Sequence, residues 1–197
     1  MTTAGLEQLQ RIGLKLFAAD GAAVAPRQLV PIFHRWIQTQ AMADQLLIDV
    51  ADYGHVPDGP GVLLVAHQGN FSLDLGGGRM GLAYNRKIAA PGSLSDRLRS
   101  LARTLLDACL QLEDDAALQG RLRFRGDELL LFANDRLHAP NDAETLAHFR
   151  PALQELVRAL YGDVDCSMSA ERDPQERFSV HVRAPSALSV RDLRRRL

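Results

Sequence analysis

Three histidines and two aspartates in the first third of the chain are the side chains best suited to chemistry. They are His34, Asp49, Asp52, His55 and His67. Imidazole and carboxylate groups are common ligands of zinc and iron, and an imidazole oriented by a carboxylate can act as a general base. The residue types alone therefore allow a metal centre or an acid-base pair.

The spacing of these residues argues against a single metal centre. If segment 46–67 is a hairpin that turns near Pro57 and Asp58, His55 lies at the turn and His67 at the open end. Strand residues advance about 3.3 Å each, so the two histidines would be roughly 20 Å apart, whereas bonds to zinc are about 2 Å long. We therefore expect no metal and no other cofactor.

The same hairpin would place His67 opposite Asp49. This arrangement suits a catalytic acid-base pair, but it is also that of an ordinary cross-strand charge pair, which stabilises a sheet by a few tenths of a kcal/mol. The catalytic hypothesis assigns Asp49 and His67 to a pocket between the first helix and the hairpin. His34, Asp52 and His55 are its candidate ligand-binding residues.

A run of three glycines, 76–78, invites comparison with a loop that cradles phosphate. A dinucleotide fingerprint needs a strand, a glycine loop and then a helix. Segment 79–86 is predicted to be a strand, so this context favours a hairpin turn. Asp74 and Arg79 flank the turn, and we expect them to pair across it; both remain candidate ligand-binding residues.

The hydrophobic pattern predicts the elements that must position these residues. Trp36 falls on the apolar stripe of the predicted helix 28–40. Ser93 is the expected N-cap of the predicted helix 93–113. Pro151 should either kink the predicted helix 141–161 or mark its true start. The predicted strands are 11–18, 46–53, 61–67, 71–75, 79–86, 122–125, 129–133, 164–169 and 177–183; the predicted helices are 28–40, 93–113, 141–161 and 189–196.

An internal correspondence suggests two similar halves. Leu16-Phe17-Ala18-Ala19-Asp20 matches Leu131-Phe132-Ala133-Asn134-Asp135, and an Ala-Pro pair follows each segment. The shared unit is strand, helix, strand, strand, over about 10–88 and 119–185, with helix 93–113 as the connector. By the same logic Arg183 should lie opposite Asp165. We predict a single α+β domain, 1–197, with largely antiparallel sheet and helices on one face.

Composition narrows the class of function. The 197 residues carry a formal net charge of -1, which gives no electrostatic footprint for nucleic acid or an anionic membrane. No signal peptide or membrane-spanning run is evident, and two cysteines make neither a disulfide framework nor a zinc motif. These features predict a cytoplasmic location.

Two functions remain open from the sequence. The first is a non-catalytic binding or assembly protein, a homodimer or a partner of another protein, whose sheet edges or helix faces would carry a sizeable exposed apolar patch. The second is the small-molecule enzyme that uses Asp49 and His67. A small-molecule ligand is compatible with both.

Overall fold

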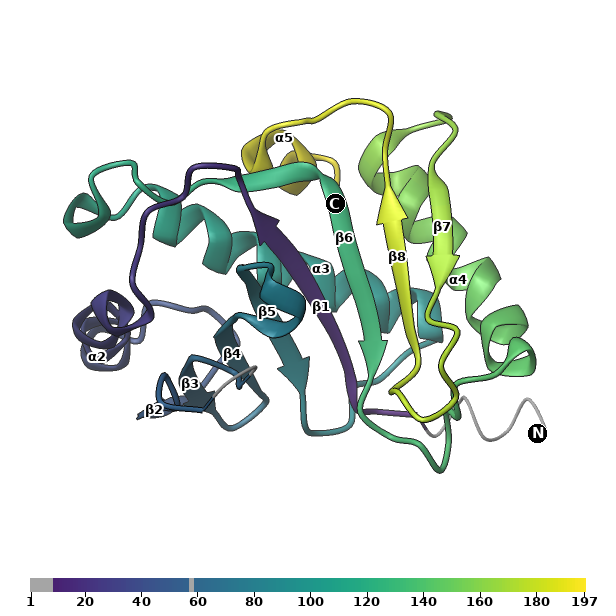
Figure 1. The fold of residues 1–197 in the computed structure, drawn as a ribbon, viewed down its shortest axis with the longest axis horizontal. Helices are drawn as coiled ribbons and strands as arrows, with labels where there is room; N and C mark the ends of the chain where they lie inside the picture. The colour runs from purple at the N-terminus through teal and green to yellow at the C-terminus, as the bar shows by residue number, and fades with distance from the viewer. Residues whose placement is uncertain (1–8, 57–58) are drawn as a thin grey trace.

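The computed structural model describes residues 9–56 and 59–197, and its centre is one antiparallel sheet of eight strands. The strands follow the order β2-β3-β4-β5-β1-β6-β8-β7 across the sheet (Figure 1). Their bounds are β1 Ile12–Ala18, β2 Leu47–Asp52, β3 Val62–Ala66, β4 Gly69–Asp74, β5 Gly81–Arg86, β6 Phe124–Ala133, β7 Ser167–Ala170 and β8 Ser179–Arg183.

Four α-helices cover one face of this sheet. They are α2 Leu29–Thr39, α3 Leu94–Glu113, α4 Ala143–Tyr161 and α5 Val190–Arg195. In Figure 1, α3 and α4 lie behind the sheet, and the described part of the chain places only the short turn between β4 and β5 over the face turned toward the viewer. Side chains alternate along a strand, so Ile12, Leu14 and Leu16 of β1 enter the core beneath α3, while Lys15 and Phe17 point to the uncovered face.

The fold class predicted from sequence is confirmed: the structure is α+β, with one antiparallel sheet and helices on one face. The predicted hairpin between strands 122–125 and 129–133 is wrong, because β6 continues through Gly126 and Asp127, with a register shift against β1 at this point. A Cβ atom on Gly126 would lie 1.8 Å from the carbonyl oxygen of Leu188. This glycine therefore permits a close approach of backbone and does not make a turn.

Helix caps follow the sequence in part. Ser93 caps α3, accepting the N–H of Asp96, while the Asp96 carboxylate accepts the N–H of Ser93. For α4 the cap is Asp142, which accepts the N–H of Thr145, and the helix continues through Pro151. Helix α4 therefore begins at Ala143, two residues later than the predicted start at 141.

The internal duplication stays a prediction. Both halves contain strand, helix, strand, strand, as β1-α2-β2-β3 and β6-α4-β7-β8. In the sheet, however, β4 and β5 separate β1 from β3, whereas β6 and β8 are direct neighbours. None of the described helices is long and apolar enough to span a bilayer.

Candidate functional site

The predicted acid-base pair does not face across the hairpin. Asp49 is opposite Val65, and the N–H of His67 donates to the carbonyl oxygen of Leu46 at 2.8 Å. His67 therefore lies beside the residue that precedes β2, and the register of β2 with β3 places Asp49 two positions away from it. The expected pairing is therefore wrong, and both side chains are exposed.

The other candidates around the hairpin also lie apart. His34 is exposed on α2, and His55 is exposed in the β2–β3 connection, at the far end of β3 from His67. Asp52 accepts a hydrogen bond from Arg27 Nε at 3.1 Å. Within the described ranges, no group of three or more histidine, cysteine or acidic side chains is placed to hold one metal ion.

Asp74 and Arg79 do flank the β4–β5 turn, but they do not pair with each other. Asp74 Oδ1 accepts a hydrogen bond from Lys15 Nζ at 2.5 Å, and Arg79 donates two hydrogen bonds to Glu128, at 2.8 and 2.6 Å. The Arg79 carbonyl oxygen also accepts from Lys15 Nζ at 2.6 Å. Arg183, expected opposite Asp165, lies opposite Glu128 and Ser167.

Glu128 is the centre of a charged cluster on the uncovered face. Its side chain is 1% exposed, and besides Arg79 it accepts from Arg183 Nε at 3.0 Å and lies 2.5 Å from His181 Nε2. The hydrogen bonds from Arg79 lower the pKa of Glu128 to about 2. Burial lowers the pKa of His181 below its usual value, and the neighbouring Glu128 carboxylate opposes that effect.

Glycines on the strands allow large side chains to lie flat across this face. A Cβ on Gly81 would lie 2.8 Å from Lys15 Cε, and one on Gly13 would lie 2.2 Å from the Phe132 ring. Lys15 therefore extends across β5 to reach Asp74. Burial lowers the pKa of Lys15, and the Asp74 carboxylate opposes that effect.

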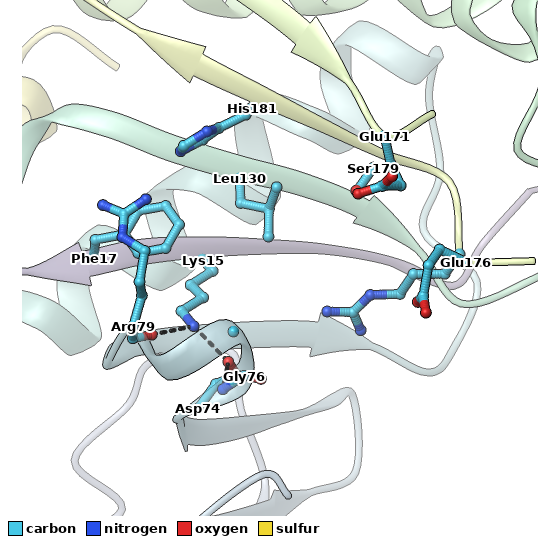
Figure 2. A pocket seen from close by; sticks show the side chains of 12 residues that line it. Lys15, Phe17, Asp74, Gly76, Arg79, Leu130, Glu171, Glu176, Ser179 and His181 are labelled. Carbon is cyan, nitrogen blue, oxygen red and sulfur yellow. Dashed lines mark hydrogen bonds and ion pairs between the residues drawn. The ribbon is translucent and has the colours of Figure 1, made fainter. Parts of the chain in front are cut away.

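A groove of about 560 Å³ opens on the uncovered face beside this cluster. Strands β1, β6 and β8 make its floor, where Lys15 lies opposite Leu130 and Leu130 lies opposite His181. Figure 2 shows Lys15 between Asp74 and the backbone of Arg79, on the opposite side of the groove from Glu176. The walls are the β4–β5 turn and the loop 171–178 between β7 and β8.

Two arginine-phenylalanine stacks border the groove. Arg79 lies 4.0 Å above the ring of Phe17, and Arg177 lies 4.0 Å above the ring of Phe132. Phe132 is opposite Gly13, which is four residues from Phe17 along β1, so the rings are roughly 13 Å apart along the strand direction. Each stack brings a cation from a hairpin loop onto the sheet.

A second distinctive surface runs along the β2 edge. Four of the six large apolar side chains that are exposed in the described ranges lie within 46–56: Leu46 at 56%, Ile48 at 53%, Val56 at 42% and Tyr53 at 41%. Strand β2 ends the sheet and pairs only with β3. The other two exposed residues, Leu137 and Val164, lie in separate loops.

Of the residues that line the groove, the sequence analysis named Asp74 and Arg79 as ligand-binding candidates but missed the others. Lys15 sits between apolar neighbours in an alternating strand, and Glu128, which anchors the cluster beside the groove, falls between the predicted strands 122–125 and 129–133. One signal was present: the matched segments of the proposed repeat contain Phe17 and Phe132, the two rings that carry arginines.

No protein-family model matches the chain, and no curated protein matches its sequence. The functional argument therefore starts from the two surfaces described above, the β2 edge and the groove.

Proposed function

We propose that this chain is a non-catalytic assembly protein that forms a homodimer through the β2 edge. The exposed apolar side chains along 46–56 are the observation that carries this proposal. An edge strand with several exposed apolar residues is a template for pairing with another chain, and soluble proteins usually blunt such edges with lysine or proline. Strand β2, Leu47–Asp52, contains neither; its charged residues are Asp49 and Asp52, and its pairing with β3 is irregular between Leu47 and Asp49.

Backbone groups of β2 support the same contact. The N–H of Tyr53 donates to Gly61, so with the alternation of an antiparallel ladder the amides of Asp52 and Val50 point away from β3. Asp49 Oδ1 accepts the N–H of Val50 at 2.8 Å and so satisfies one of these outward groups within the monomer. This bond would exchange for a strand-to-strand bond in the dimer.

A two-fold axis through β2 would pair this strand antiparallel with its own copy. Such an interface is isologous, because the same patch serves both subunits and closes the assembly at two. The opposite edge strand, β7, offers a weaker contact because it is only four residues long and contains Ser167 and Ser169. The proposal therefore assigns the dimer to β2.

The test is the molar mass in solution, measured by light scattering after size exclusion. The wild type should elute as a species of twice 21.7 kDa, and the double variant Leu46→Lys, Ile48→Lys as a monomer, because two lysines place like charges at the edge. Leu137→Lys is the matched control: this residue is 82% exposed but distant in sequence from the β2 segment, so the dimer should persist.

Either of two results would contradict the dimer proposal. One is a wild type that stays monomeric at the highest soluble concentration. The other is a double variant that dimerises as well as the wild type does. The catalytic alternative gains no support from the geometry, because the exposed side chains of Asp49 and His67 are not opposite each other.

A further inference from the structure

The groove on the uncovered face has the size of a small-molecule site. Its volume of about 560 Å³ lies within the range of roughly 300–1,000 Å³ that is typical of ligand pockets. Apolar surface from Phe17 and Leu130 adjoins polar groups from Lys15, Ser179 and His181. A mixed lining of this kind can hold an apolar body and orient a polar end.

Most charges around the groove are already compensated within the protein. Lys15 is paired with Asp74, and Arg79 and Arg183 share the carboxylate of Glu128. These groups have little capacity left for a charged ligand, since each cation already donates to a carboxylate. They fix the shape of the floor and of one wall.

Arg177 differs from these cations. It is half-buried, and among the described residues it makes one side-chain hydrogen bond, to Asn134 Oδ1 at 3.2 Å, and no ion pair. Burial lowers the pKa of Arg177, and the more distant Asp74 and Glu176 oppose this only through space. A partly desolvated guanidinium without a carboxylate is unfavourable, and binding an anion would relieve that cost.

The charge of the lining limits what this anion can be. Among the cations of the described lining, Arg177 is the one without a hydrogen-bonded carboxylate, while Glu171 and Glu176 contribute negative charge at the loop wall. A ligand with two or more negative charges would be repelled by these carboxylates. A planar carboxylate matches the guanidinium fork, which can donate two parallel hydrogen bonds.

We infer that the groove binds a small organic monocarboxylate, whose carboxylate pairs with Arg177 and whose apolar body covers Leu130. Phe132 holds the guanidinium from below, at 4.0 Å, and so orients it for this contact. The Ser179 hydroxyl lines the same groove and can donate a further hydrogen bond. The site is separate from the β2 edge, so failure of the dimer test leaves this inference standing.

The test is an NMR titration with acetate, hexanoate and benzoate, with inorganic phosphate for comparison. The Nε–H resonance of Arg177 and the methyl resonances of Leu130 should shift together and saturate, most strongly with the two probes that carry an apolar body. In Arg177→Gln the affinity for benzoate should fall roughly tenfold or more, the loss expected for a charge-assisted hydrogen-bonded pair.

Two variants control for charge and folding. Arg177→Lys keeps the charge but not the fork, so its affinity should be intermediate. Arg172→Gln removes an exposed arginine from the same loop and should bind benzoate like the wild type. The inference is overturned if Arg177→Gln binds benzoate at full strength, if phosphate binds more tightly than the carboxylates, or if no probe gives a saturable shift at Arg177.

Discussion

Glu128 illustrates what a single residue can contribute to this sheet. Its carboxylate is almost fully buried, yet it receives two hydrogen bonds from Arg79 and one from Arg183. Removing a buried ion that has several partners costs free energy, because the charges of the partners are then left uncompensated. Burial of Glu128 therefore depends on the cations that reach it from β8 and from the β4–β5 turn.

This dependence predicts a pH effect on stability. Folding lowers the pKa of Glu128 from its ordinary value of 4.5 to about 2. The associated stabilisation is complete above pH 4.5 and is lost as the pH falls toward 2. The arginines are partly exposed, so solvent screens their attraction to Glu128. The stabilisation should therefore amount to about 1–3 kcal/mol. Urea denaturation of the wild type from pH 7 to pH 2 measures it.

The variant Glu128→Gln isolates this contribution. It should be less stable than the wild type at pH 7, and its free energy of unfolding should fall less steeply below pH 4.5. Glu155→Gln, which replaces an exposed glutamate on α4, should follow the wild-type curve. Parallel pH profiles for wild type and Glu128→Gln would contradict the assignment.

At the scale of elements, α4 contains a proline that its packing tolerates. Pro151 is exposed in the middle of the helix, whereas Phe149 and Leu153 beside it are buried. A proline inside a helix removes one backbone hydrogen bond and crowds the preceding turn. The buried stripe of α4 therefore holds the helix together across this defect.

Replacing Pro151 should consequently stabilise the protein. Pro151→Ala restores the N–H donor without removing a buried contact, and we expect the free energy of unfolding to rise by about 1–3 kcal/mol. Chemical denaturation at pH 7 is the measurement. A variant with equal or lower stability would show that the proline fits α4 without strain.

Elements with strong local signals were predictable from the sequence. Helix α3 has a cap at Ser93 and a continuous apolar stripe, and the observed bounds, Leu94–Glu113, agree with the prediction. The turn at Gly126 was wrong because the reason for the glycine is a contact with Leu188, which lies far away in the sequence. Local patterns carry no information about such a contact.

The candidate site was less predictable for the same reason. The groove joins Lys15, Arg79 and Arg177, which come from three distant segments. Their pairing depends on the order of strands in the sheet and on register, and the register of β2 with β3 places Val65, not His67, opposite Asp49. Residue types suggested charged pairs, but only the topology decides which residues meet.

At the scale of the whole molecule, one sheet runs through both halves. Strand β1 pairs with β5 on one side and with β6 on the other, so neither half can separate without breaking the central ladder. A continuous core under α2, α3 and α4 joins the same parts. We therefore expect the chain to unfold as one cooperative unit.

The single tryptophan makes this testable. Trp36 is buried on α2, which packs on β2 near one end of the sheet, whereas far-UV circular dichroism reports on all elements. Urea transitions followed by the two signals should coincide. Separate midpoints would mean that the β2 end unfolds independently of the β6–β8 part.

The central place of β1 also has a consequence for synthesis of the chain. Leu14, in the strand that is synthesised first among the described ones, pairs with Tyr84 and Leu131. Until β6 has emerged, the middle strand of the sheet has one unpaired edge. Closing such long loops is slow because their entropy is lost before the contacts form. During synthesis, strand β1 therefore stays without its β6 partner until the residues between the two strands have been made.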